Sequence, residues 1–590
     1  MLSRSATASA EPSDPAPPVQ PAEPVQRPER DAYSALERSV IDQQLAARGL
    51  SYESAPEGKQ IEDIQVVALD VFDERDPMPD FVNVFHATTS EPVIRRELLF
   101  SEGEPYRASF VHETARNLRN IQQLSIVLIV PMKGSRSDRV RVLVITKDVW
   151  SLRLNWALAF SNSGGISSLV LNPSEENLFG THAVVGALFI MDPAVYSLGV
   201  SLGHRRLFGS HQQISLSANL INNRDTGVSE GSFGEFRYGQ PLYSLDTEWS
   251  WGTSILWRTD IARRFKDGDV AIREGIPVEY NRDRLYGGYE LVRSFGRHFK
   301  YDLSVGFEAD RGIYTTRDLS RYSPQQVQRF IAAELPLSDQ RIGPFVQLHA
   351  HRTDYRTFLE VETLGLQEDF RRGHDFLLRM YSGIGALGST RDVVGSQASL
   401  SYTLPLGDGF VRPVVSSTIE SATQNRDDGL FQAALRVVSP RLGFARLMID
   451  GIFLDRYRNY LKRRYSLGGD SRLRGYVPGA FPGANVIAVN TELRSTSLDI
   501  LSAQVGAAVF YDVGDANDQL DQFRLKHSVG LGVRVLFPEF DRIVMRMDWG
   551  FPLTPTRDNP NTLPGGFFLS FGQAFSMPGV PVPSVLTEKL

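Results

Sequence analysis

A period-two alternation of apolar and polar residues, running from about Trp150 to about Phe575, constrains this chain more than any other feature. In this region strand-like segments alternate with turns rich in Gly, Asn, Asp and Pro. In SVGLGVRVLF, for example, Leu531 and Val533 lie on one face and Arg534 lies on the other. Such alternation indicates half-buried β-strands, because successive side chains of a strand point to opposite faces.

The two faces of the last strands favour a membrane barrel over a soluble β-sandwich, which would also alternate. The polar face carries both charges and glycines, as a barrel lumen does. Aromatic residues stand at strand ends, where interfacial girdles belong; these are Phe537, Trp549, Phe551 and Phe575. We therefore predict a transmembrane antiparallel β-barrel, with a large soluble all-β protein as the alternative.

Length and composition exclude several other classes. A chain of 590 residues exceeds what one core needs, so at least two structural units are expected. No run of 18 apolar residues occurs, which excludes a helical membrane protein. The near balance of 63 Lys+Arg and 69 Asp+Glu gives no reason to expect nucleic acid. The absence of cysteine excludes disulfides and thiolate metal sites.

The residues before the barrel have helical as well as strand-like periodicity, which predicts a small α+β domain. Pro92 in the first turn and Glu91 beside it suit the start of one helix. The expected order is β-α-α-β-β. Its elements are Ile64–Phe72, Glu91–Phe100, Ala108–Asn120, Leu124–Val130 and Arg139–Lys147.

The chain thus divides into five predicted parts. Residues 1–30, rich in Pro and Ala, are expected to be a disordered linker or the remnant of a signal segment. The other parts are a helix and linker at 31–60, the α+β domain at 61–148, the barrel at 149–575 with an inward-folded loop at 455–484, and a tail at 576–590.

Two short motifs give the barrel a specific resemblance. LRGY comprises Leu473, Arg474, Gly475 and Tyr476, and FYDVG contains Phe510, Asp512 and Gly514. The chain resembles the BamA/TamA superfamily of outer-membrane assembly and secretion barrels, which carries similar motifs, over about residues 61–575. The resemblance implies that LRGY lies on a loop that folds into the lumen of a sixteen-stranded barrel, with five strands after it.

The same resemblance bears on both ends of the chain. The α+β domain is similar to a POTRA domain, the periplasmic module before such barrels. The final strand resembles the signal by which outer-membrane barrels are recognised for insertion; its residues are Phe567, Leu569, Phe571 and Phe575. More strand-like segments precede the loop than the eleven that sixteen strands allow, so either some are false or the barrel is larger.

Alternation predicts how the loop is held. Asp512 should face the lumen together with Phe510 and Gly514, and Glu492 and Asp548 should also point inward. An arginine fork pairs a carboxylate bidentately, and such pairs are favoured where solvent is partly excluded. We predict that Arg474 pairs with Asp512, with Glu492 or Asp548 as the next candidate partner.

The resemblance implies a non-enzymatic machine in the outer membrane of a Gram-negative bacterium, with its POTRA domain in the periplasm. It would assist insertion of outer-membrane proteins through an openable seam; alternatives are a polypeptide-secretion pore of the two-partner type and a passive porin-like channel. Expected partners are unfolded outer-membrane or secreted proteins, lipid and lipopolysaccharide, and accessory proteins of the periplasm or inner membrane.

No catalytic, metal or cofactor site is predicted. GVSEG spells a nucleophile-elbow motif but lies in a polar turn between strands, where the required strand–turn–helix context is missing. His349 and His351 share one strand face, but the sequence shows no third ligand. We therefore interpret the two histidines as polar residues of the barrel wall.

Overall fold

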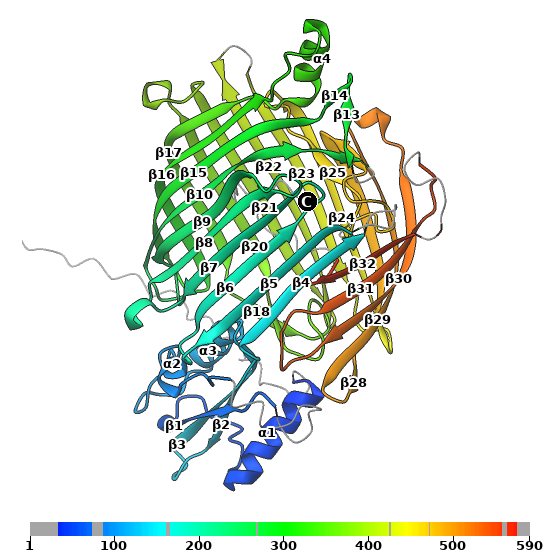
Figure 1. Cartoon of the computed structure of the whole chain (residues 1–590). Helices are drawn as coiled ribbons and strands as arrows, with labels where there is room; N and C mark the ends of the chain where they lie inside the picture. Colours follow the sequence, from blue (N-terminus) through cyan, green and yellow to red (C-terminus); the bar gives the residue numbers. More distant parts are fainter. Residues whose placement is uncertain are drawn as a thin grey trace, which may run out of the picture.

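A computed structural model describes residues 33–72, 86–160, 166–266, 269–423, 426–470, 472–556, 563 and 565–574. A large β-barrel carries a small α+β domain at one of its open ends (Figure 1). We call this end of the barrel the domain end and the opposite end the far end. The terminal segments 1–30 and 576–590, together with Phe575, lie outside the described residues.

The N-terminal domain has one helix before a β-α-α-β-β unit. Its strands form a three-stranded sheet in the order β1-β3-β2, with β1 parallel and β2 antiparallel to β3. The elements are α1 (Ala35–Arg48), β1 (Gln60–Leu69), α2 (Glu91–Arg95), α3 (Ala108–Arg119), β2 (Leu124–Lys133) and β3 (Arg139–Asp148).

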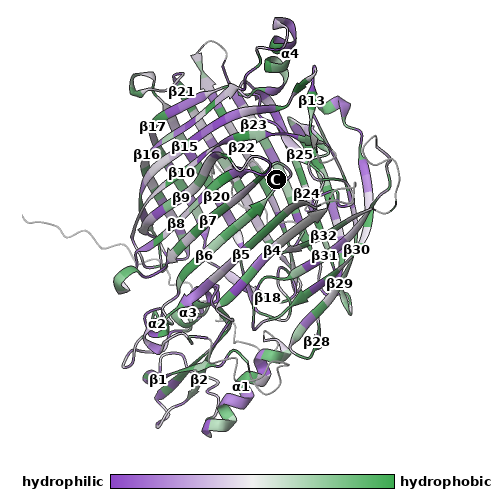
Figure 2. Ribbon diagram, viewed as in Figure 1, coloured by the Kyte–Doolittle hydropathy of each residue, from purple (hydrophilic) through white to green (hydrophobic). Residues whose placement is uncertain are grey.

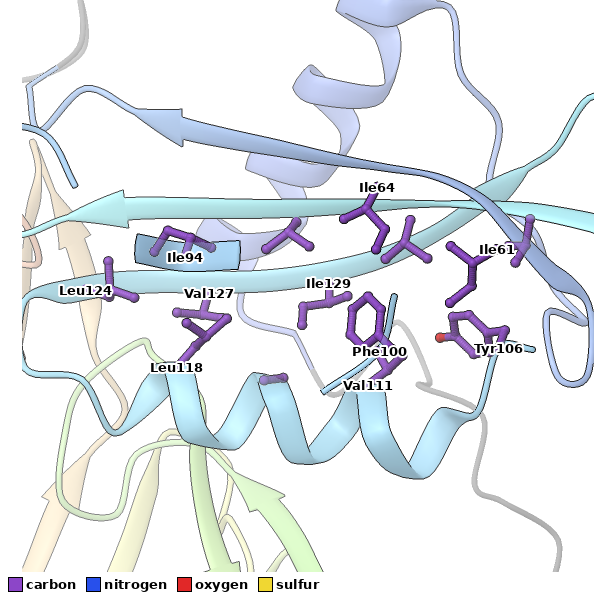
Figure 3. Packing of buried hydrophobic residues seen from close by; sticks show 14 of the residues in the cluster. Ile61, Ile64, Ile94, Phe100, Tyr106, Val111, Leu118, Leu124, Val127 and Ile129 are labelled. Atoms are coloured by element: carbon purple, nitrogen blue, oxygen red, sulfur yellow. The ribbon is translucent and has the colours of Figure 1, made fainter. Parts of the chain in front are cut away.

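Both faces of this sheet are buried. One face packs against α2 and α3 through residues such as Ile94, Leu118 and Val127 (Figure 3). The alternate side chains, including Leu128 and Ile145, face a second cluster that contains Val40 of α1. Burial on both faces explains why β2 contains the unbroken apolar run IVLIV, residues 126–130, rather than an alternating pattern.

The first helix of the β-α-α-β-β unit is shorter than predicted. The sequence suggested a helix over Glu91–Phe100, but α2 ends at Arg95. Tighter turns follow, because Glu97 N donates to Ile94 O at 3.0 Å and Leu98 N donates to Arg95 O at 3.2 Å. Glu97 then turns toward the barrel and forms an ion pair with Arg206 at 2.7 Å.

The barrel is an antiparallel meander that closes on itself. Within the described residues it has twenty wall strands, since the three-residue β28 (Leu498–Ile500) only prolongs β27 along β29. The first ten are β4 (Leu152–Phe160), β5 (Ile166–Leu178), β6 (Ala183–Met191), β7 (Val195–His204), β8 (Gln213–Asn223), β9 (Ser229–Gln240), β10 (Trp249–Arg263), β15 (Glu279–Phe295), β16 (Phe299–Thr316) and β17 (Asp339–Arg352). The other ten are β20 (Gly373–Gly383), β21 (Val393–Leu406), β22 (Gly409–Ala422), β23 (Asp428–Val438), β24 (Ala445–Asn459), β27 (Asn485–Ser495), β29 (Ala503–Asn517), β30 (Lys526–Leu536), β31 (Met545–Pro552) and β32 (Gly566–Phe571).

The implied count of sixteen strands is therefore wrong. Five strands follow the LRGY loop as expected, but fifteen rather than eleven precede it among the described residues. The additional strand-like segments noted in the sequence are real strands, and the barrel is larger. The loop itself begins after Asn459, because β24 continues four residues past the predicted loop start at 455.

The two surfaces of the barrel wall differ as the alternation predicts. Hydrophobic and hydrophilic residues follow one another along the strands (Figure 2). Outward residues such as Val200, Leu531 and Trp549 are about half exposed, whereas inward Arg534 is 1% exposed. An apolar outer face with a charged interior fits a lipid-facing barrel.

Smaller elements decorate the two ends. At the far end lie the helix α4 (Pro324–Glu334) and the short hairpins β11 (Phe265–Lys266) with β12 (Asp269–Val270) and β13 (Ile272–Arg273) with β14 (Ile276–Pro277). At the domain end, β18 (Tyr355–Phe358) pairs with β19 (Glu368–Arg371) in the long turn after β17. No helix of the described chain is both long and apolar enough to cross a membrane.

Candidate functional site

The LRGY loop enters the barrel from the far end. Between β24 and β27, the strands β25 (Tyr465–Leu467) and β26 (Phe481–Gly483) form a short hairpin from which the tip descends. Leu473 and Arg474 are fully buried, and Tyr476 is 1% exposed. The apolar members of this tip pack on wall residues that include Leu454 and Val486. The loop is thus part of the barrel core.

Arg474 is the centre of the buried charge cluster that holds the tip. Its Nε and Nη2 donate to Asp512 Oδ2 and Oδ1, both at 2.8 Å, which is the predicted bidentate pair. Nη1 donates to Asp548 Oδ2 at 3.0 Å and also to Glu492 Oε1. The guanidinium carbon lies 3.6 Å from the centroid of the Phe510 ring, so a cation–π contact covers one face.

The structure therefore joins Arg474 to all three predicted carboxylates rather than to one of them. Further arginines of the wall balance their charge. Arg534 Nη1 donates to Asp548 Oδ1 at 2.6 Å, and Arg494 Nε donates to Glu492 Oε2 at 2.6 Å. Arg546 Nη1 reaches Asp548 Oδ2 at 2.8 Å. Buried charges require such partners, because an unpaired ion in a low-dielectric interior is very costly.

These wall arginines were not predicted as partners from the sequence. Arg534 and Arg546 do alternate onto the same face as Asp548, so the signal was present. What the sequence could not supply was the strand register. The structure places Arg534 opposite Arg546 on β30 and β31, with Asp548 one inward position further along β31.

Two glycines let the loop backbone touch the wall. A Cβ atom at Gly550 of β31 would stand 2.6 Å from the carbonyl carbon of Arg474 and 2.7 Å from the nitrogen of Gly475. Gly475 itself has φ +105°, a conformation that favours glycine. Tyr476 completes the contact: its hydroxyl lies 2.9 Å from His527 O and 3.0 Å from Thr554 O.

The remaining predicted motif residues lie apart from the cluster. Gly514 faces inward on β29, two positions beyond Asp512. In the final strand, Phe567 is 44% exposed, and the Phe571 ring meets Trp156 of β4 edge-on at 6.3 Å. Leu569 stands opposite Leu158 of β4. Leu569 and Phe571 thus lie at the junction of the first and last strands, Phe567 is opposite Trp549 of β31, and Phe575 lies outside the described residues.

A long turn at the domain end, residues 353–372, is a second feature of the site, and we call it the domain-side hairpin. This hairpin was not predicted from the sequence. Leu364 and Leu366 are buried in the cluster that contains Val40 of α1. Arg119 of α3 donates to Asp369 Oδ2 at 2.7 Å. The hairpin therefore stands between the N-terminal domain and the barrel lumen.

Ion pairs connect this hairpin with the LRGY loop. Arg436 of β23 donates from Nη1 to Glu362 Oε1 at 2.7 Å and from Nε to Asp450 Oδ2 at 2.9 Å. Asp450 in turn accepts from Arg472 of the loop at 2.6 Å. A second set of contacts involves Arg494, whose Nη1 donates to Val361 O of the hairpin at 2.8 Å and whose Nε donates to Glu492. The domain, hairpin and loop tip form one continuous polar network.

Glu368 of the hairpin should make its docking depend on pH. Burial, together with repulsion from Glu362, raises the pKa of Glu368 to about 8, even though Val361 N and Glu362 N donate to its carboxylate. The docked hairpin therefore binds a proton more tightly than the undocked one. The contribution of Glu368 to the stability of the docked hairpin should be fully present below about pH 4.5 and should be lost as pH rises toward about 8.

This pH dependence can be followed by limited proteolysis of the folded protein. Cleavage within residues 353–372 should accelerate as pH rises, and Glu368→Gln should flatten the profile because an amide does not titrate. Val361 N and Glu362 N donate to different oxygens of the carboxylate, so the glutamine keeps only one of these two bonds and its profile should be flat at a lower overall protection. Glu91→Gln, at an exposed helix position, is the matched control and should keep the wild-type profile. An unchanged profile in Glu368→Gln would contradict this assignment.

Comparison with known proteins places the barrel in a family. The Omp85 superfamily domain matches residues 206–575, which is more than half of the chain. The chain belongs to the Omp85 superfamily. Barrels of this superfamily are outer-membrane proteins of Gram-negative bacteria. A search of curated protein sequences finds no match.

Solved structures of Omp85 barrels are similar to the chain at low identity. CdiB from Escherichia coli is 13% identical with a TM-score of 0.43, over 88% of this chain and 77% of that one. CdiB from Acinetobacter baumannii is 13% identical with a TM-score of 0.41, over 87% and 73%. BamA from Haemophilus ducreyi is 13% identical with a TM-score of 0.33, over 92% and 93%. The family assignment rests on the domain match.

Proposed function

We propose that this Omp85 protein is a non-enzymatic machine that assists insertion of outer-membrane proteins by opening the seam between β4 and β32. The observation that carries the proposal is the short pairing at this seam. Among the described residues only Phe568 with Ala159 and Leu569 with Leu158 are paired there. By contrast, every residue of β32 is paired with β31, from Gly566 opposite Gly550 to Phe571 opposite Met545.

A short seam matters because a closed barrel has no free strand edge. Opening it exposes unpaired backbone groups of β4 and β32, onto which an incoming strand can add by β-augmentation. Along the described part of the seam, few hydrogen bonds need to break for this to occur. Meanwhile the Arg474 cluster ties the loop to β27, β29 and β31, so the C-terminal part of the wall stays ordered while the seam opens.

The N-terminal domain is proposed to be a POTRA domain in the periplasm, which makes the domain end of the barrel periplasmic. Its sheet has one protected edge: segment 51–53 lies along β2, where Lys133 N donates to Ser51 O at 2.9 Å. Beyond Ile64, the outer edge of β1 has no backbone partner within the described residues. This edge is a candidate for binding client strands or accessory proteins.

A polypeptide-secretion pore is the second candidate function, and a cavity in the lumen supports it. A cavity of about 930 Å³ lies beside β5–β10, away from the loop tip. Polar side chains line much of it; examples are Asn172, Ser174, Arg237 and Glu290. None of the residues that line this cavity belongs to the LRGY loop or to the charge cluster around Arg474.

Depletion of the protein in its native host separates these functions from each other and from a passive channel. The assembly proposal predicts that the amounts of folded outer-membrane proteins fall, as measured by heat-modifiable migration and surface labelling. A secretion pore predicts that a secreted protein accumulates in the periplasm while other barrels are unchanged. Reduced uptake of small solutes alone would support the porin-like alternative and contradict both proposals.

A further inference from the structure

A group of three side chains that could bind a metal lies in the lumen at the domain end, apart from the buried charge cluster around Arg474. His349 and His351 occupy alternate positions of β17 and both face inward. The register of β16 against β17 sets Asp302 directly opposite His349. The sequence shows no third ligand beside the two histidines, but strand pairing provides one. We propose that Asp302, His349 and His351 bind a divalent transition-metal ion of the Zn²⁺ class.

The distances suit such an ion. Asp302 Oδ2 lies 3.7 Å from His349 Nδ1 and 3.8 Å from His351 Nδ1. The three candidate ligand atoms all lie within 4.8 Å of one another. Zinc binds imidazole nitrogen and carboxylate oxygen at about 2.0–2.2 Å, so ligands of one tetrahedral ion stand roughly 3.3–3.6 Å apart. Small side-chain adjustments would close the site, and a water molecule can complete the coordination.

The hydrogen bonds of the two histidines point to the same atoms. His351 is 9% exposed, and its Nδ1 has no hydrogen-bond partner within the part of the chain that the structure describes. A buried ring nitrogen left in this way requires an explanation. His349 Nε2 lies 2.8 Å from Asp375 Oδ1 of β20. If Nε2 donates this bond, Nδ1 keeps its lone pair and faces Asp302, which is the carboxylate–histidine–metal arrangement of many zinc sites.

The two nearby cations have other partners. Arg371 of the domain-side hairpin pairs with Asp375, and Lys300 Nζ donates to Leu245 O at 2.8 Å. The chain of contacts from the ion would therefore run through His349 and Asp375 to Arg371. The ion would join β16 to β17 where the hairpin begins and would hold the root of the hairpin against the wall.

Zinc binding to the full-length protein in detergent micelles tests the site. After removal of metal with EDTA, calorimetric titration with Zn²⁺ should give one bound ion per chain, and X-ray absorption at the zinc edge should show nitrogen and oxygen ligands. Asp302→Asn, His349→Gln and His351→Gln should each weaken binding at least tenfold. His374→Gln is the matched control, because His374 on neighbouring β20 stacks on Phe299 instead, and it should bind as the wild type does.

Each outcome decides the proposal. Folding of every variant is checked by heat-modifiable migration, so that loss of binding in a folded variant supports the site. Protection of the hairpin from proteolysis should rise with Zn²⁺ in the wild type and in His374→Gln only. If Zn²⁺ does not bind, or if it binds equally to the wild type and the three ligand variants, the proposal is wrong.

Discussion

Arg474→Ala is expected to destabilise the folded barrel by about 3–5 kcal/mol, the range for breaking one partner out of a buried ion cluster. The wild-type guanidinium is fully buried and touches three buried carboxylates, on Asp512, Glu492 and Asp548. Wall arginines still neutralise Glu492 and Asp548 in the variant. Asp512 has no second ion-pair partner among the described residues, so its carboxylate would be left buried and uncompensated.

Urea unfolding in detergent micelles, followed by tryptophan fluorescence, measures this loss. Arg474→Lys should give an intermediate loss, because the ammonium keeps the charge but cannot form the bidentate fork. Arg464→Ala is the matched control on the same loop. Its side chain is 44% exposed, and its ion pair with Asp518 should contribute about 1 kcal/mol or less. Unfolding of Arg474→Ala within 1 kcal/mol of the wild type would contradict the anchor.

Gly550→Ala is expected to move the loop tip off the wall, at a cost of about 1–3 kcal/mol. The added methyl group meets backbone atoms of Arg474 and Gly475 at 2.6–2.7 Å, and backbone atoms cannot rotate away as a side chain can. The guanidinium of Arg474 would then lose its alignment with Asp512, so part of the ion-pair energy is lost as well. This variant tests the loop position without removing any charge.

Protease sensitivity of the loop and urea unfolding both report on this displacement. Gly287→Ala is the matched control, since a Cβ at this strand glycine meets no atom within 4 Å. The control should be neutral. A Gly550→Ala protein whose loop stays protected and whose stability equals that of Gly287→Ala would show that the loop does not depend on this contact.

The sequence was sufficient for the features that depend on period two. Asp512, Glu492 and Asp548 could be placed inward because each alternates with outward residues on a strand. The pair with Arg474 followed from charge only after the family resemblance had placed the loop in the lumen. Likewise, the β-α-α-β-β order followed from the change between helical and strand periodicity. The inward placement of the carboxylates and the order of the elements need only the local backbone pattern.

Features that depend on register or on distant packing could not be predicted. Arg534 became a partner of Asp548 only through the pairing of β30 with β31, and Asp302 met His349 only through the pairing of β16 with β17. The burial of the domain-side hairpin could not be predicted, because Leu364 and Leu366 are covered by α1 and the domain sheet rather than by their neighbours in sequence. The expected number of sixteen strands was wrong because it came from the family resemblance and not from the number of strand-like segments in this sequence.

Locking the seam tests the central claim most directly. The chain has no cysteine, and one row of the wall runs Val533, Met547, Leu569, Leu158 from β30 to β4. A disulfide between Leu569→Cys and Leu158→Cys closes the seam. One between Val533→Cys and Met547→Cys, in the same row, joins strands that need not separate. We predict that oxidised seam-locked protein fails to restore outer-membrane protein levels in a depleted strain, that a reductant restores function, and that the control lock functions throughout. Full function of the oxidised seam-locked protein would contradict the proposed mechanism.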